Sequence, residues 1–175
     1  MELINKLEKL VLGWAKNVPH LPVVAQKWLG TNVWWIARIG AIVSGIAFLF
    51  AIGAVFTAVS LLASPSSLYY IAGTYSGMIV VNAIIGLVFL AITGLLMAVA
   101  VTPLKAKQKK GWVLLFFVLL VEAVSIVVNA VLSFSVFGFI STVLFGAIAL
   151  AIGAYFLTEI HGQFGHAPKA TIKKA

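Results

Sequence analysis

The sequence contains no cysteine, which excludes disulfide bonds, thiol catalysis and thiolate metal sites. Charge is also scarce: 9% of the 175 residues are charged, whereas 63% are hydrophobic. A water-soluble domain cannot cover its surface with so few charges, so the soluble globular classes are excluded. The length suits one compact domain that contains roughly four membrane spans of about 20 residues each.

Long stretches of the chain lack charge altogether. No charged residue lies between Ile39 and Leu104, and Glu122 is the only one between Gly111 and Thr158. These stretches do not alternate strictly and are too long for strands, so a β-barrel is excluded. The sequence therefore predicts an all-α fold, an integral membrane antiparallel four-helix bundle. Its spans are expected at about 33–62, 78–101, 112–134 and 140–160.

The connections between the spans differ in charge. Residues 64–77 are uncharged and rich in turn formers, residues 102–111 are strongly basic, and residues 135–139 are expected to form a tight apolar turn. Basic residues favour the cytoplasmic side of a membrane. Both termini and the basic connection are therefore predicted to be cytoplasmic, in the inner membrane of a bacterium. All five tryptophans lie near the same predicted boundary, as aromatic belt residues do.

Residues 1–32 are predicted to form a cytoplasmic amphipathic segment at the membrane interface. Over residues 3–14, apolar side chains share one helical face and charged ones occupy the other. Two prolines within 17–22 break this helix. A second short helix is expected over about 23–29, ended by Gly30, before the first span begins.

Lysines gather on the predicted cytoplasmic side, and residues 161–175 are expected to form a basic cytoplasmic tail. The net charge of +8 does not indicate nucleic-acid binding, because the lysines flank membrane boundaries and include no recognition motif. A bilayer with anionic headgroups is the expected partner. The predicted lipid contacts are Lys6, Lys9, Lys16, Lys105, Lys107, Lys109 and Lys110.

Glu122 is the one acid expected deep in the membrane. It follows Trp112 by ten residues, which corresponds to about 15 Å along a helix and brings it near the bilayer centre. An ionisable group there is costly unless it is paired, hydrated or neutralised. Polar residues share its helical face, and others occupy one face of span two at similar depths. The candidate polar site comprises Glu122, Ser125, Asn129 and Ser133 with Thr93 and Asn82.

Two interpretations of this polar site stay open. In one it is an interior seam whose side chains hold the helices together by hydrogen bonds. In the other it lines a hydrated path to the outer face, and Glu122 binds a proton or cation. The apolar residues Leu115, Val118 and Leu119 lie inward of Glu122 and favour the seam. Arg38 is the candidate counter-charge, although it would have to bridge about 9 Å of axial offset.

Small residues four positions apart recur in spans one and four, as in Gly40 and Ser44, and such spacing lets helices approach closely. At the end of span four, Glu159, His161 and His166 do not have the spacing of a metal site and are expected in an exposed, solvated tail. His20 is expected to be interfacial. No metal, cofactor or catalytic motif is indicated.

Three segments, WLGTNVWWI (28–36), PLKAKQKKGW (103–112) and SVFGFI (135–140), resemble those of a family of small, uncharacterised bacterial four-span membrane proteins. The resemblance covers most of the chain and implies no activity or ligand. The leading function hypothesis is a non-enzymatic membrane component that self-associates or serves a larger assembly as an accessory subunit. The alternatives are a small proton- or cation-coupled transporter or channel centred on Glu122, and a binder of lipid or small apolar molecules between the helices.

Overall fold

The computed structural model describes residues 6–7, 10–11, 13–14, 18–62, 68–133 and 135–165, with the backbone alone for 61–62 and 68–79. Within this part of the chain there are four long helices, one short 3₁₀ helix and no strand. The predicted all-α class, with four helices packed against one another, is confirmed. The elements are α2 (Val23–Leu62), α3 (Leu68–Lys105), α4 (Lys109–Val131), α5 (Val136–Ile160) and η1 (His161–Gln163).

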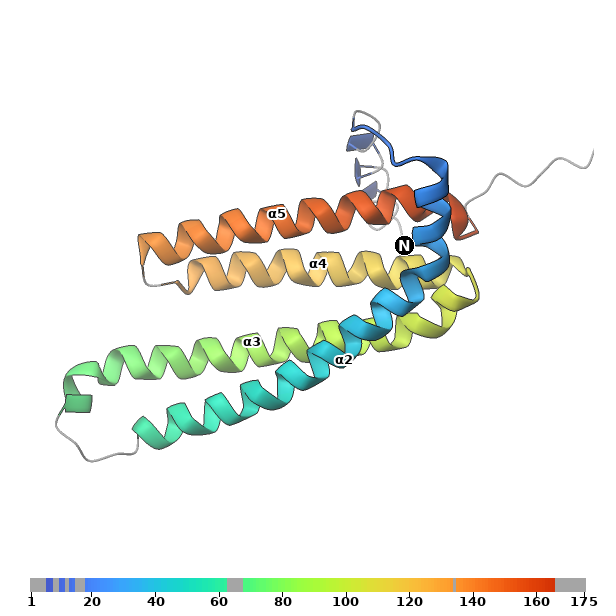
Figure 1. The fold of residues 1–175 in the computed structure, drawn as a ribbon. Helices are drawn as coiled ribbons and strands as arrows, with labels where there is room; N and C mark the ends of the chain where they lie inside the picture. The colour runs from blue at the N-terminus through green and yellow to red at the C-terminus, as the bar shows by residue number, and fades with distance from the viewer. Residues whose placement is uncertain are drawn as a thin grey trace, which may run out of the picture.

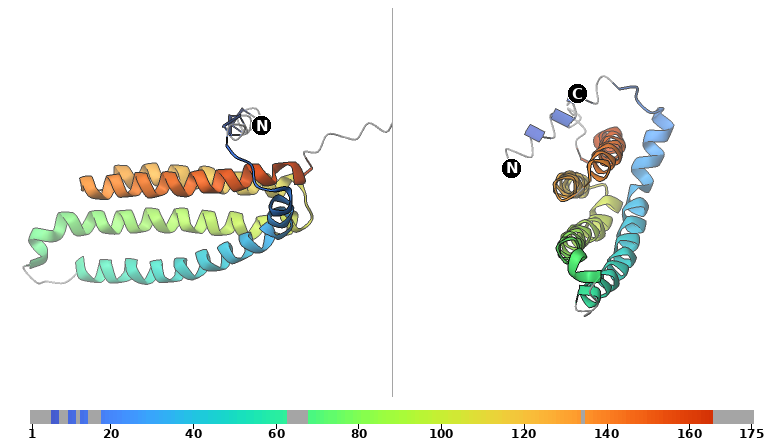
Figure 2. Two further views of the ribbon diagram at one scale, coloured as in Figure 1. Left: turned by 45° about the horizontal axis from the view of Figure 1, so that its top comes forward. Right: turned by 90° about the vertical axis from the view of Figure 1, so that its left-hand side faces the viewer.

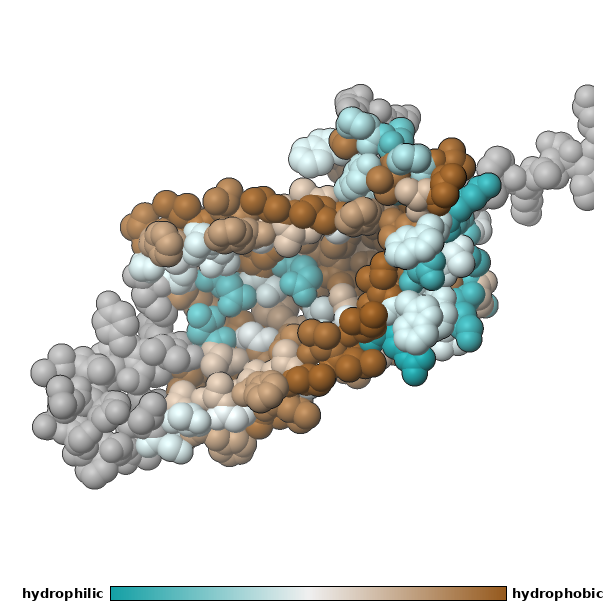
Figure 3. Space-filling view, in the orientation of Figure 1, coloured by the Kyte–Doolittle hydropathy of each residue, from teal (hydrophilic) through white to brown (hydrophobic). Residues whose placement is uncertain are grey.

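Three of the long helices lie side by side, and the fourth crosses them. The helices α3, α4 and α5 follow one another in an arc, while α2 slants from the end of α5 to the start of α3 (Figures 1 and 2). The α3–α4 turn, the start of α2 and the end of α5 lie together at what we call the basic end. The α2–α3 and α4–α5 connections lie at the opposite, far end (Figure 1). The helix α2 diverges from α5 toward the far end, and the space-filling view shows a hollow between the two helices (Figure 3).

The helix α2 is longer than the predicted first span and includes the short helix expected over 23–29. Gly30 does not end that helix, which corrects the prediction. A single glycine costs a helix only about 1 kcal/mol, and a Cβ at Gly30 would collide with the side chain of Gln163. Asn32 lies within α2, where its side-chain amide donates to Trp28 O at 2.8 Å.

The other boundaries also differ from the predicted spans. The helix α3 begins at Leu68, inside the stretch expected to form a turn-rich connection, and continues through Pro103 to Lys105. Pro103 has no backbone N–H, so the carbonyl of Val99 lacks its i→i−4 partner in the last turn of α3. The helix α5 begins within the expected 135–139 turn, because Ser135 accepts a hydrogen bond from Gly138 N at 2.9 Å and caps it. Residues that were expected to form the last connection therefore begin α5 and cap it.

The core lies at the basic end of the bundle. Trp112 on α4 is buried, stacks on Phe116 and donates from Nε1 to Leu157 O on α5 at 2.8 Å. Gly111 is packed so tightly that a Cβ there would lie 2.6 Å from the backbone nitrogen of Leu104. The buried cluster consists of Val33, Ala37, Ala100, Leu104, Trp112, Phe116, Leu157, Ile160 and Phe164.

On the face shown in Figure 3, the edges of the bundle along the helices are largely hydrophobic. Large hydrophobic side chains such as Phe50, Val131 and Phe145 are more than two-thirds exposed. Four helices in the described part of the chain are long and apolar enough to cross a membrane. This agrees with the composition, which leaves too few charges for a soluble surface.

The two terminal predictions fall largely outside the described residues. Most of the expected amphipathic helix over 1–17 is not described, although Leu7 and Val11 pack against the core cluster. The structure describes the C-terminal tail only as far as Gly165. Lys9, Lys16 and His166 lie outside the described residues.

Candidate functional site

Thr93 on α3 and Glu122 on α4 form a hydrogen-bonded pair near the middle of the helices. The Thr93 hydroxyl donates to Oε1 of Glu122 at 3.0 Å, and Thr93 is only 4% exposed. Glu122 is half-buried and lies on the side of α4 opposite the exposed residues Val124, Val127 and Val131. The structure therefore brings together two of the candidate site residues, on the inner face of the bundle.

The remaining polar residues of α4 bond within their own helix. Asn129 Nδ2 donates to the backbone oxygen of Ser125 at 2.7 Å and to its hydroxyl at 3.1 Å. Ser133 donates to Ala130 O at 2.8 Å. No hydrogen bond joins Asn82 to Asn129 in the part of the chain that the structure describes, and Oδ1 of Asn82 is buried without a partner. Among the described residues, the bond from Thr93 to Glu122 is therefore the one that links this polar face to another helix.

The hollow between α2 and α5 changes character along its length. Hydrophilic residues gather on its floor toward the far end (Figure 3). Toward the basic end it becomes an apolar cavity of about 380 Å³, which we call the inner chamber. Leu115, Val118 and Leu119, which lie inward of Glu122 in the sequence, are among its lining residues. The full lining is Leu29, Val33, Ile36, Met97, Leu115, Val118, Leu119, Gly153, Phe156, Leu157 and Ile160.

Arg38 does not reach Glu122. Its side chain is exposed on α2, and the guanidinium carbon lies 5.3 Å from the centre of the Trp35 ring. Among the described residues Arg38 forms no salt bridge with Glu122, and the close contact of this kind is between His20 Nδ1 and Glu159, at 2.7 Å. The attraction between a cation and the face of an indole ring stabilises the Arg38 side chain in this position. The structure therefore leaves the predicted counter-charge apart from the candidate site.

The predicted lipid contacts have different environments. Nζ of Lys107, in the α3–α4 turn, donates to Gly30 O on α2 at 2.6 Å, and its backbone has a φ of 53°. Burial lowers the pKa of the Lys107 ammonium by desolvation. Lys107 therefore ties two elements of the protein together, whereas Lys6, Lys109 and Lys110 are exposed. Lys105 lies over the Trp34 ring at 5.2 Å.

Glu159 is not in a solvated tail, so that prediction was wrong. Its side chain is 1% exposed and accepts hydrogen bonds from His20 Nδ1 at 2.7 Å, Leu21 N at 2.9 Å and Gln26 Nε2 at 2.8 Å. The first two partners belong to residues 18–22, which we call the strap. Tyr155 fixes the strap as well, because its hydroxyl donates to Pro19 O at 2.8 Å. His20 is thus a partner of Glu159 and not merely an interfacial residue.

Sequence reasoning missed this cluster because its members lie more than 130 positions apart. The available signal was an acid at the end of an apolar run together with a histidine between two prolines. His161, the other expected tail residue, packs edge-on against Trp112 at 4.8 Å. No group of three or more histidine, cysteine or acidic residues that could hold a metal occurs among the described residues.

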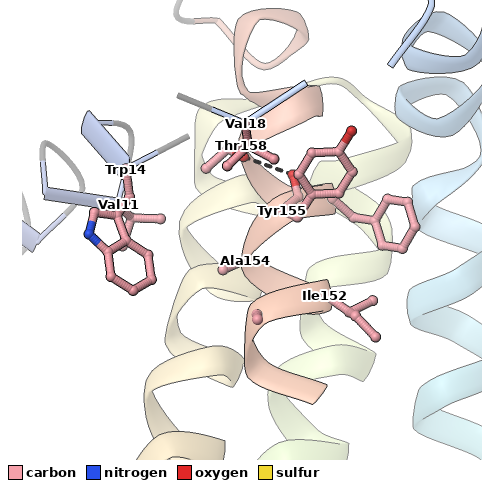
Figure 4. Close-up of a pocket in the computed structure, with 9 residues that line it drawn as sticks. Val11, Trp14, Val18, Ile152, Ala154, Tyr155 and Thr158 are labelled. Atoms are coloured by element: carbon pink, nitrogen blue, oxygen red, sulfur yellow. Dashed lines mark hydrogen bonds between the residues drawn. The ribbon is translucent and has the colours of Figure 1, made fainter. Parts of the chain in front are cut away.

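A second apolar depression lies between the N-terminal segment and α5. Val11 and Trp14 stand on one side of it, and Ala154 on α5 lies on the other (Figure 4). The depression has a volume of about 580 Å³. Lys6 lines an adjoining depression that shares Trp14. A cation therefore lies beside an apolar surface at the basic end.

Small residues pack the helices together and also leave one groove uncovered. Gly40 faces Met97, and Ser44 faces Gly94, so the expected small-residue pair on α2 is used against α3. On the outside of the same two helices is a groove of about 350 Å³, which we call the α2–α3 groove. It is lined by Ala41, Ser44, Gly45, Phe48, Leu90, Ala91, Gly94, Leu95 and Ala98.

A match to a protein of known function would indicate what this site does. No protein-family model, curated protein or solved structure matches the chain. The resemblance to small bacterial four-span membrane proteins stays a prediction from the sequence. What the chain does is therefore inferred from the geometry of its own residues.

Proposed function

We propose that the chain is a non-enzymatic integral membrane protein that associates with further membrane helices. The partner is a second copy of the chain or a larger assembly in which the chain is an accessory subunit. The support is the combination of four helices apolar enough to cross a bilayer with an uncovered groove of small residues. In lipid, helices associate by close packing at such residues, because the hydrophobic effect gives no preference for protein over lipid.

The α2–α3 groove is the observation that carries this proposal. Gly45 in the groove has no atom within 4 Å of the position of a Cβ, so a neighbouring helix could approach its backbone closely. Ser44 and Gly94 also line the groove but already contact each other inside the monomer, which leaves Gly45 as its open glycine. The groove therefore offers a complementary surface that the chain's own described helices leave free.

The proposed setting is a bacterial inner membrane that the helices cross in antiparallel order, with both termini in the cytoplasm. The basic end would then face the cytoplasm, where basic residues are favoured. The exposed lysines Lys6, Lys105, Lys109 and Lys110 would contact anionic headgroups. The residues of the N-terminal segment would lie in the interface, with Trp14 (83% exposed) at headgroup level.

Size measurements on the purified protein test the association. In mild detergent, light scattering coupled to gel filtration should give a mass above that of one 18.6 kDa chain, or a partner should co-purify. Gly45→Leu fills the groove and should shift the protein toward the monomer. Gly53→Leu, the same change at another open position of α2, is the matched control. A strictly monomeric parent without a partner would contradict the proposal.

A second candidate function is proton- or cation-coupled transport centred on Glu122. The specific observation is that this carboxylate is half-buried and has one hydrogen bond, from Thr93, among the described residues. The apolar walls of the inner chamber interrupt any polar route toward the basic end, which weighs against it. Loss of a pH-dependent flux in proteoliposomes of Glu122→Gln would support transport, and an unchanged flux would exclude Glu122 as its centre.

Binding of lipid or a small apolar molecule between the helices is the third candidate. The two apolar cavities at the basic end favour it, since their volumes of about 380 and 580 Å³ lie in the range of small-molecule sites. Native mass spectrometry with a phosphatidylglycerol and a matched phosphatidylcholine tests this candidate. Retention of neither lipid would count against it.

A further inference from the structure

The inner chamber and the Thr93–Glu122 pair adjoin each other. Val118 and Leu119 line the chamber and precede Glu122 by about one turn of α4. Met97 also lines the chamber and follows Thr93 by about one turn of α3. One turn is about 5 Å. The hydrogen-bonded pair therefore lies at the edge of the chamber, on the side that leads to the far end.

The charge of Glu122 has no counterpart in the described part of the protein. Its single hydrogen bond comes from the neutral hydroxyl of Thr93. Arg38 is exposed over Trp35, and the ammonium of Lys107 is held at Gly30. A carboxylate beside apolar walls is costly unless it is paired or neutralised. When ionised, Glu122 therefore has the charge to attract a cation, and the described residues supply none beside it.

The residues that line the inner chamber determine which class of cation the site can bind. An inorganic cation such as Mg²⁺ or Ca²⁺ needs about six or more oxygen ligands, whereas the chamber walls are hydrocarbon from Leu, Val, Ile, Met and Phe side chains. A weakly hydrated organic cation needs the opposite, one anion and a large apolar surface. A volume of about 380 Å³ accommodates a small molecule of that kind.

We propose that this site binds a hydrophobic organic cation, with its apolar groups in the inner chamber and its charge against the carboxylate of Glu122. The inference rests on the second candidate function, in which Glu122 binds a cation, and names the class of ligand. It is a statement about equilibrium binding and does not require transport. Lateral access is available from the hollow between α2 and α5 (Figure 3).

Binding to the full-length protein in detergent tests the proposal. Calorimetric titration would use tetraphenylphosphonium as the cation and triphenylphosphine oxide as a neutral molecule of similar shape. The cation should bind the parent, and the neutral molecule should bind at least about tenfold more weakly. Glu122→Gln keeps an oxygen to accept from Thr93 and removes the charge, so it should weaken binding of the cation by at least about tenfold. Glu122→Asp should retain most of the binding.

A separate pair of variants tests whether the cation occupies the inner chamber. Ile36 lines the chamber and is 50% exposed, so Ile36→Trp should obstruct it and weaken binding. Ile42→Trp, at a position of α2 that is 55% exposed and outside the chamber lining, should not. Gel filtration and thermal melting show which variants keep the fold.

Several outcomes overturn the proposal. It fails if the parent does not bind tetraphenylphosphonium, if folded Glu122→Gln binds it as well as the parent does, or if the neutral molecule binds equally well. The outcome for transport is separate. Cation binding without any flux would remove the second candidate function and leave this site standing. A proton flux that needs Glu122, in a protein that does not bind the cation, would do the reverse.

Discussion

The carboxylate of Glu159 lies 2.7 Å from Nδ1 of His20, although 139 positions separate the two residues. This contact joins the end of α5 to the strap that precedes α2. The same carboxylate also accepts from Leu21 N and Gln26 Nε2. One buried acid therefore fixes the direction in which the chain enters α2, and with it the closure of the basic end.

Replacing Glu159 should release the strap. Glu159→Gln keeps one acceptor oxygen and presents an amide group where donors now point, so we expect a loss of stability of about 1–3 kcal/mol. Hydrogen exchange at the Leu21 amide should accelerate, because that N–H donates to the carboxylate. Glu122→Gln, an equal change on another helix, should leave this exchange rate unchanged. Unaltered exchange in Glu159→Gln would show that the carboxylate does not hold the strap.

Lys107 should stabilise the contact between the α3–α4 turn and α2. Lys107→Asn tolerates the positive φ and loses the bond from the ammonium to Gly30 O. We expect it to lower the free energy of unfolding by about 1 kcal/mol, measured by thermal melting in detergent. Lys110→Asn removes an exposed lysine and is the matched control. Equal melting temperatures for the two variants would contradict the prediction.

The ionisation of Lys107 also predicts the direction in which the stability of the protein changes with pH. Its pKa is lower in the folded protein than in the unfolded chain, because burial disfavours the charged form. Between the two pKa values the unfolded chain holds more protons, so stability rises with pH across that interval. Alkaline denaturation series should show this rise in the parent and a smaller one in Lys107→Asn. The prediction would be refuted if the stability of the parent fell more steeply with rising pH than that of Lys107→Asn.

Two glycines should respond in opposite ways to alanine. A Cβ at Gly111 would meet the backbone of Pro103 and Leu104 at 3.0 Å or less, and backbone cannot move aside cheaply. Gly111→Ala should therefore destabilise the protein by about 1–3 kcal/mol. Gly86→Ala meets nothing within 4 Å and should be neutral or stabilising by up to about 1 kcal/mol. Thermal melting of both variants checks the pair, and a reversed order would contradict the packing described.

The Thr93–Glu122 hydrogen bond should be measurable as a coupling energy. Thr93→Val and Glu122→Leu each break it, and the double variant removes both partners. A double-mutant cycle on thermal stability should give a coupling of about 0.6–2 kcal/mol in favour of the bond. Strictly additive effects would mean that the 3.0 Å contact contributes nothing.

Part of this architecture could be read from local pattern. The helices α4 and α5 begin and end within about four residues of the expected spans, because apolar runs bounded by lysines or turn formers are local signals. The start of α3 could not, since Leu68–Gly77 contains serine, glycine and tyrosine that are compatible with either a turn or a helix. Gly30 misled for a related reason: glycine ends helices and also lies where another side chain approaches.

The candidate site, too, could be predicted from the sequence only in part. Helical periodicity was enough to group Glu122, Ser125, Asn129 and Ser133 on one face, because i+3, i+7 and i+11 positions share a face whatever the neighbours are. Counting residues along adjacent spans placed Thr93 at a depth similar to that of Glu122, and the structure shows that the two bond. Periodicity does not tell which side chains bond across helices, and here Asn129 bonds to its own helix.

By itself the sequence determined the all-α class, the number of long apolar helices, and the distribution of charge toward one end. These depend on composition and on period, which act within a few turns of chain. Only the tertiary structure decided that Glu159 is buried, that Lys107 binds Gly30, and that a hollow opens between α2 and α5. Such contacts join residues far apart in the sequence, and they arise from how helices pack, which no local pattern encodes.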